Sequence, residues 1–192
     1  AQCARLGDVA QHHHRAHQAI LAVVDGRQRA LHQQERTVLA LQPQVARLAG
    51  AYGPNKEKDG YARGDIGFLT KPLSDRVRRF PEAGGGLFST THDILRYGFM
   101  LANDGELEGR RYLSHGLMDE LRKEQTGKTG VNYSLGYHLR NGMFGHDGAL
   151  GTDLSVNPKT GMVAVFMVQC TSGDQWAARD LFLRTATQVF PK

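Results

Sequence analysis

Cysteines and long apolar runs are scarce in this sequence. Its two cysteines, Cys3 and Cys170, stand far apart among 192 residues, so a disulfide framework of the kind that holds small secreted domains together is not indicated. No apolar stretch reaches the roughly 18 residues that a membrane-spanning helix needs, and no secretory signal is recognisable. The first residue is Ala1 rather than methionine, which leaves open a removed leader or a fragment and, with it, the location in the cell.

Charge is present without being concentrated. The formal net charge is +5 and the pI is near 9.4, which permits weak attraction to anionic surfaces. The basic residues are scattered and form no stripe with aromatic side chains, so we expect no nucleic-acid partner. With 40% hydrophobic and 22% charged residues, the composition is that of an ordinary globular protein, and the length suits one domain with a sizeable core.

Residues 1–40 differ from the rest, since they contain no lysine and hold five of the nine histidines. Apolar residues at three-four spacing predict an amphipathic helix at the start of this leader. An apolar run that meets Asp25-Gly26 and is followed by a second run predicts a β-hairpin. The positions that carry the helical spacing are Leu6, Val9, His13, Ala16, Ile20 and Val23.

The histidines of this leader invite a metal-binding interpretation. His13 and His17 are one helical turn apart, as two ligands on one helix face would be. No nearby Cys, Asp or Glu convincingly completes the set, so we expect a solvated helix face and no metal site. A metal-binding leader on a scaffold is kept as the weaker alternative.

The middle of the chain combines a long loop with two helices. Residues 45–52 predict a short helix, and residues 53–83, rich in Gly, Pro and charge, predict a long surface loop. After the glycine run at 84–86, Ser89 or Thr90 can cap a helix that ends at Asn103-Asp104-Gly105. A turn over 106–114 then leads to a second cap and a short helix marked by Leu117, Met118 and Leu121.

The last third of the chain alternates apolar and polar residues. The run over 133–140 is closed by Asn141-Gly142, a dipeptide that favours a tight hairpin turn. Further runs around 144–156 and 162–169 complete three consecutive antiparallel strands. A C-terminal helix follows and is expected to pack on this sheet through Ala177, Leu181, Phe182, Thr185 and Val189.

Two segments carry a resemblance to a known family. Ala83-Gly84-Gly85-Gly86-Leu87-Phe88-Ser89-Thr90 resembles the Ala-Gly-Gly-Leu-x-Ser-Thr segment of serine β-lactamases and penicillin-binding proteins. His146-Asp147-Gly148 is similar to the His-x-Gly that replaces Lys-Thr-Gly in the class C and esterase-like branch of these hydrolases. The resemblance covers residues 41–192 and implies an α+β fold in which an antiparallel sheet carries a packed C-terminal helix, an incomplete β-lactamase/transpeptidase-like domain.

The resemblance also implies a site at the strand that carries this motif. His146 would be the catalytic residue, and Asp147, Gly148 and Ala149 would bind substrate, with the Ala149 N–H as one of two oxyanion donors. Lys128-Thr129-Gly130 matches the third family motif literally. It falls in a loop before the strands, however, and we therefore favour His146.

Two further family motifs are missing from the sequence. No serine has a lysine three residues on, and no Tyr-x-Asn occurs; Tyr112-Leu113-Ser114 has related spacing but follows the glycine helix. A Ser-x-x-Lys turn places nucleophile and lysine on one helix face, and without it no acyl-enzyme can form. The expectation is a truncated hydrolase, inactive alone, with a non-catalytic peptide- or partner-binding module as the alternative.

The resemblance limits what can be said of ligands and partners. It implies no cofactor. A small-molecule or peptide substrate would bind if the helical half were supplied, and a complementary fragment or a homo-oligomer are the partners to consider. Relatives are commonly periplasmic or secreted. The substrate itself stays open, because in this family it depends on cleft walls that are mostly absent here.

Overall fold

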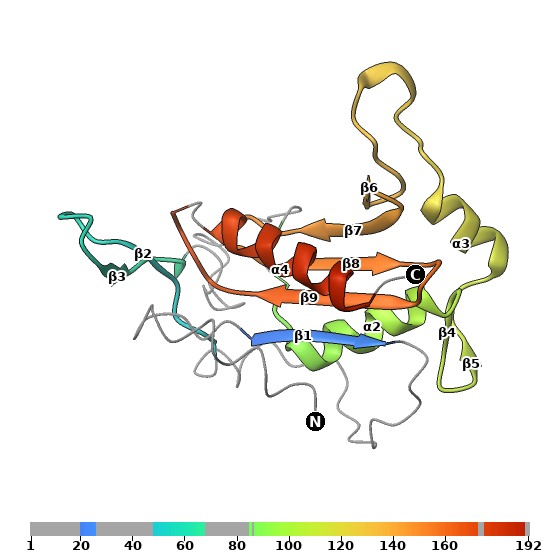
Figure 1. Cartoon of the computed structure of the whole chain (residues 1–192), viewed down its shortest axis with the longest axis horizontal. Helices are drawn as coiled ribbons and strands as arrows, with labels where there is room; N and C mark the ends of the chain where they lie inside the picture. The colour runs from blue at the N-terminus through green and yellow to red at the C-terminus, as the bar shows by residue number, and fades with distance from the viewer. Residues whose placement is uncertain (1–19, 26–47, 68–84, 86, 173–174, 191–192) are drawn as a thin grey trace, which may run out of the picture.

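A five-stranded antiparallel sheet organises the chain (Figure 1). The computed structural model describes residues 20–25, 48–67, 85, 87–172 and 175–190. Every neighbouring pair of strands in the sheet is antiparallel, which confirms the predicted α+β class. In spatial order, the strands are β1 (Ile20–Asp25), β9 (Met162–Met167), β8 (Asp153–Asn157), β7 (Met143–Asp147) and β6 (His138–Arg140).

Helix α2 (Thr91–Ala102) covers one face of this sheet. Thr90 begins the helix as predicted, because its hydroxyl accepts a hydrogen bond from the Asp93 N–H at 3.1 Å. The helix ends before Asp104 and Gly105, which both have positive φ. Apolar side chains of α2 meet those of β8 and β9 in the main core, which includes Leu95, Leu101, Phe144, Leu154, Val156, Val163 and Val165.

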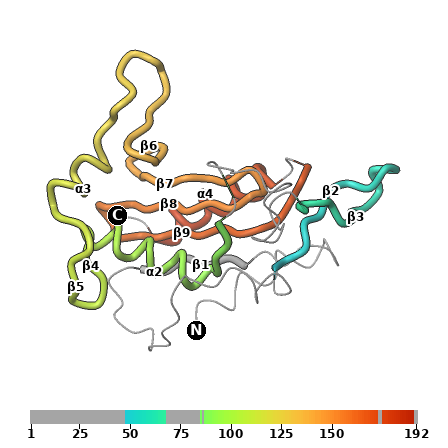
Figure 2. The backbone as a smooth tube through the Cα atoms, turned by 180° about the vertical axis from the view of Figure 1, so that it is seen from behind, coloured from blue at the N-terminus to red at the C-terminus, as the bar shows by residue number. Residues whose placement is uncertain are grey.

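Helix α4 (Gln175–Val189) covers the opposite face, as a comparison of Figures 1 and 2 shows. Phe182 packs against Ala164 and Phe166 of β9 in a second, smaller core. The prediction that this helix packs on the sheet is therefore confirmed, and so is the burial of Phe182, but the rest of the predicted face is shifted. Leu181 and Val189 are 52% and 58% exposed. The stripe that faces the sheet instead contains Gln175, Phe182 and Ala186 together with the mostly buried Arg179, and apolar spacing cannot reveal its polar members.

The segments before the glycine run differ from their predictions. The expected helix over 45–52 is wrong for its described part, because residues 48–51 are not helical and Tyr52 begins strand β2 (Tyr52–Pro54). This strand pairs with β3 (Tyr61–Arg63), so the predicted loop contains a hairpin. The Tyr52 N–H also donates to the Gln169 carbonyl at 2.9 Å, which attaches the hairpin to the end of β9.

The predicted leader is described only in part. Its first apolar run forms β1, which pairs along its length with β9. Ile20 and Val23 therefore belong to a strand, and the helical spacing does not extend through them. The rest of the expected helix, the second half of the hairpin, His12–His14 and His17, and Cys3 all lie outside the described residues. Cys170 is a buried free thiol.

The connection into β6 departs from a simple hairpin. Strand β6 is shorter than the predicted run over 133–140, because Gly136 has positive φ and turns the chain before His138. The Asn141-Gly142 turn is confirmed, with φ of 53° and 78°. Lys128 lies in a short 3₁₀ turn, η4 (Gly127–Thr129), within a loop that projects beyond β6 (Figure 1).

The remaining elements connect α2 to that loop. A small hairpin of β4 (Glu106–Leu107) and β5 (Arg110–Arg111) leads to α3 (His115–Arg122). Ser114 caps α3 by accepting from the Leu117 N–H at 3.3 Å, as the predicted turn and cap require. Within the residues that the structure describes, none of the helices has the length and apolar character needed to cross a membrane.

Two glycines in helices make a matched test of this packing. A Cβ at Gly98 of α2 would stand 2.4 Å from Val163 Cγ1, whereas one at Gly116 of α3 would meet nothing within 4 Å. We expect Gly98→Ala to destabilise the fold by about 1–3 kcal/mol through overpacking. Gly116→Ala should stabilise it by up to about 1 kcal/mol through helix propensity. Urea denaturation of both variants measures this, and equal free energies of unfolding would contradict the packing of α2 on β9.

Candidate active site

His146 lies near the end of β7 and pairs with Leu154 of β8. Side chains alternate along a strand, so His146 shares the sheet face of Phe144, which is covered by α2 further along the strand. The imidazole itself is exposed. Its Nδ1–H donates to the Asp147 carbonyl at 2.6 Å. In the neutral form of the ring, this hydrogen bond makes Nε2 the acceptor that His146 presents to solvent.

Two other rings lie against this imidazole. The His138 ring is 5.0 Å from that of His146, and the Tyr133 ring stands edge-on to both, at 4.7 Å from His138 and 5.7 Å from His146. Burial and the charge of Arg140 lower the pKa of His138, with Asp147 opposing them. His138 is therefore a neutral imidazole at pH 7, and the base of the projecting loop forms an aromatic wall beside His146.

The segment after Asp147 folds into a tight turn. The Gly151 N–H donates to the Gly148 carbonyl at 2.8 Å, and the Cys170 N–H donates to the Leu150 carbonyl at 2.8 Å. The Gln175 amide donates to the Ala149 carbonyl at 3.4 Å. All three carbonyls of the turn face donors of the protein, while within the described chain no hydrogen bond uses the Ala149 N–H. That group is therefore available to an external acceptor.

Gly145 explains how two strands come so close at this point. It pairs with Ser155, and a Cβ placed on it would stand 1.8 Å from the Leu154 carbonyl oxygen. No side chain fits there, so the position requires glycine. The close approach fixes β7 against β8 directly before His146.

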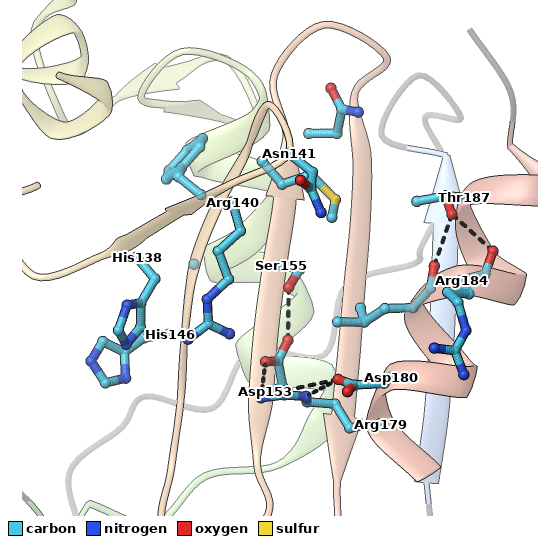
Figure 3. Close-up of a pocket in the computed structure, with 15 residues that line it drawn as sticks. His138, Arg140, Asn141, His146, Asp153, Ser155, Arg179, Asp180, Arg184 and Thr187 are labelled. Atoms are coloured by element: carbon cyan, nitrogen blue, oxygen red, sulfur yellow. Dashed lines mark hydrogen bonds and ion pairs between the residues drawn. The ribbon is translucent and has the colours of Figure 1, made fainter. Parts of the chain in front are cut away.

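A network of ion pairs holds the middle residue of the motif. Asp147 of β7 is paired in register with Asp153 of β8, and like charges directly opposite one another are destabilising. Arg179 of α4 reaches both carboxylates, with Nη1 at 3.4 Å from Asp147 and 3.7 Å from Asp153. Arg140 of β6 donates to Asp147 from the other side at 3.1 Å. The network thus joins three strands to the C-terminal helix, and Figure 3 shows the part of it in which Arg179 meets Asp153 and Asp180.

This environment shifts the pKa values of Asp147 and Asp153 in opposite directions. Burial would raise the pKa of Asp147, but the charges of Arg140 and Arg179 and hydrogen bonds to the carboxylate hold it below its usual value. Burial raises the pKa of Asp153, whose side chain is 2% exposed, although a hydrogen bond from Ser155 and the charge of Arg179 oppose it. Asp147 is the anchored anion, and Asp153 is the carboxylate for which burial is costly.

The structure places the predicted site residues together and adds others. His146, Asp147, Gly148 and Ala149 run continuously from β7 into the turn, whereas Lys128 lies on the projecting loop and Tyr112 follows the β4–β5 hairpin. Sequence reasoning missed Tyr133, Asp153, Gln175 and Arg179. The one available signal was the pair Asp147 and Asp153 on either side of a tight turn, because two carboxylates brought so close together require a nearby cation such as Arg179.

The site offers no ready metal centre. Among the residues that the structure describes, no group of three or more His, Cys, Asp or Glu side chains is arranged to hold a metal ion. The polar groups that the described residues offer at this strand end include the His146 imidazole and the Ala149 N–H.

The ion-pair network predicts a pH-dependent stability. Arg179→Met should cost about 2–4 kcal/mol at pH 7, because it leaves the buried Asp153 carboxylate opposite Asp147 without the cation that bridges them, while Asp147 keeps only Arg140. The deficit in the free energy of unfolding, relative to wild type, should shrink as the pH falls toward the raised pKa of Asp153. In the variant, protonation of Asp153 removes the repulsion between the two carboxylates. The wild type, at the same time, loses the stability that ionised Asp147 contributes.

Urea denaturation across this pH range is the measurement. Arg184→Met, an exposed position on the same helix, is the control and should stay within about 0.5 kcal/mol of wild type. A deficit for Arg179→Met that is independent of pH would show that packing, and not charge, explains the loss.

Comparisons with known proteins give a family match and partial structural matches. No curated protein matches the chain. Solved structures named "putative beta-lactamase", from Bacteroides dorei, and "putative 6-aminohexanoate-dimer hydrolase", from Bacillus anthracis, align at 19% and 22% identity with TM-scores of 0.42 and 0.45. They cover 52% and 54% of this chain, which in turn spans only 37% and 30% of theirs. The family model for beta-lactamase matches residues 19–188, a stretch that runs from β1 through nearly all of α4, and the chain thus belongs to the beta-lactamase family.

Proposed function

We propose that this chain is a β-lactamase-related serine hydrolase in truncated form, which keeps the strand side of an acyl-transfer site and is inactive alone. The observation that carries the proposal is the lack of a Ser-x-x-Lys and of a Tyr-x-Asn segment anywhere in the 192 residues. Membership of the beta-lactamase family and the geometry around His146 support the part of the proposal that concerns the strand side of the site. The proposal also names the substrate class, since a complete site of this kind would act on a β-lactam, an ester or a peptide.

The strand side has defined roles in such a reaction. The Ala149 N–H would hold the oxyanion of a tetrahedral intermediate, an interaction worth about 3–4 kcal/mol in comparable sites. His146 Nε2 would face the same intermediate as a hydrogen-bonding group in the place of the family lysine. Asp147 and Gly148 would line the substrate through the backbone, since the Asp147 side chain is already held by two arginines.

The serines with known contacts do not replace the missing nucleophile. Ser114 caps α3, Ser134 is buried and donates to the Tyr137 carbonyl, Ser155 donates to Asp153, and the Ser172 hydroxyl contacts Cys170 Sγ at 2.9 Å. None of these four contacts involves a lysine or a tyrosine hydroxyl, so none of them supplies the proton acceptor that activates an alcohol in this family. An oxyanion donor without a nucleophile can bind an acyl group but cannot form a covalent intermediate with it.

The test is turnover by the purified chain. Nitrocefin and p-nitrophenyl acetate should be hydrolysed at rates proportional to substrate concentration, without saturation, and His146→Ala should behave like wild type. Saturable hydrolysis that is lost in His146→Ala would overturn the proposal.

A second measurement looks for the covalent step directly. Incubation with a fluorescent penicillin, followed by mass spectrometry of the intact chain, should show no adduct. An adduct that maps to a serine would identify a nucleophile and would refute the claim that the site is incomplete, even if turnover were too slow to follow.

The alternative function is a non-catalytic peptide- or partner-binding module on the same scaffold. Exposed apolar side chains favour it, with Leu87, Val131 and Leu135 at 96%, 51% and 54% exposed. A homo-oligomer or a complementary fragment that supplies a helical half would cover such residues. Light scattering across a range of protein concentrations distinguishes a homo-oligomer from a chain that needs a complementary fragment, because only self-association should raise the measured mass as the concentration rises. Leu135→Ser should weaken that self-association.

A further inference from the structure

A groove of about 600 Å³ runs from His138 and His146 across the α4 side of the sheet. Strand β8 alternates between apolar residues that face α2 and a polar row of Asp153, Ser155 and Asn157 that lines this groove. Helix α4 packs over β9 through Phe182 and does not cover β8 in the same way. Polar residues are usual on a sheet face that is not fully covered, so it is the charged groups of the groove that point to a ligand.

The charges that line the groove are not all engaged within the protein. Asp180 and the buried Asp153 both pair with Arg179. Arg140 donates through Nη2 to Asp147 and keeps its other donors. Arg184 is exposed and lines the same groove, and among the described residues the ion pairs of α4 are all made by Arg179 and not by Arg184. Arg140 and Arg184 stand on opposite sides of Ser155 in Figure 3, one from β6 and one from α4.

The walls between these cations are mixed in character. Met143 and Leu183 contribute apolar surface, and the Asn157 amide and the Ser155 hydroxyl lie along the floor. The volume lies within the 300–1,000 Å³ typical of small-molecule sites, which combine apolar walls with a few convergent polar groups. Guanidinium groups are the usual partners of carboxylates, because their planar donors match both oxygens.

We propose that this groove is a second binding site, which takes a small organic carboxylate with an apolar body. The carboxylate lies between Arg184 and Arg140, and the apolar body rests on Met143 and Leu183. This second site shares the groove with His146, but its contacts differ from those of the proposed acyl-transfer site. It requires neither a nucleophile nor the Ala149 N–H, so it would operate in a chain that forms no acyl-enzyme.

Benzoate and its neutral isostere benzamide test the site on the full chain. In amide NMR spectra, benzoate should cause saturable shifts at Ser155, Asn157 and Arg184. Benzamide should bind at least about tenfold more weakly, because the charge-assisted hydrogen bonds are lost. Equal binding of the two probes, or benzoate shifts that centre on Ala149 instead of the groove, would overturn the proposal.

Matched substitutions locate the charge that matters. Arg184→Gln should weaken benzoate binding by about tenfold and leave the melting temperature unchanged, because its side chain is exposed. Arg110→Gln, an exposed arginine on β5, removes the same net charge elsewhere and should leave binding unchanged. Identical losses in the two variants would mean that net charge alone attracts the probe, and an unchanged affinity in Arg184→Gln would refute the site.

Discussion

The position of one guanidinium between two opposed carboxylates constrains the whole sheet edge. Asp147 and Asp153 face each other across β7 and β8, and this pairing is tolerable only with a cation between them. That cation is Arg179, which α4 supplies from a distant part of the chain. Because Asp147 is the centre of the His146–Gly148 motif, the contact that fastens the C-terminal helix also fixes the direction of the strand that carries the site.

This dependence explains which parts of the fold could be predicted from the sequence. The caps at Thr90 and Ser114 and the Asn141-Gly142 turn depend on neighbours within a few residues, and the pattern in the sequence was sufficient for each. The buried face of α4 was not predictable in the same way. Apolar spacing selected Leu181 and Val189, whereas the structure buries Arg179 because the aspartates that need it lie on two other strands.

The same limit applies to the segment around Tyr52. Its local sequence favours a helix, but its backbone N–H and carbonyl bond to Gln169 and Thr171 beyond the end of β9. A backbone group satisfied by a partner more than a hundred residues away outweighs a weak helix propensity. Likewise, the motif His146–Ala149 was identifiable from its resemblance, whereas Tyr133, which forms its aromatic wall, belongs to a loop whose path is set by Gly136 and by the pairing of β6.

The contacts that shape the site come from a small set of neighbouring elements. His146 is held by the Asp147 carbonyl, Asp147 by arginines of β6 and α4, and the turn at Ala149 by Gln175 and Cys170. Arg140 belongs to β6, Arg179 and Gln175 belong to α4, and Cys170 lies between β9 and α4. The shape and charge of this strand end therefore depend on the sheet, on the C-terminal helix and on the segment that joins them. A surface organised by such contacts can recognise a ligand whether or not it also takes part in a covalent step.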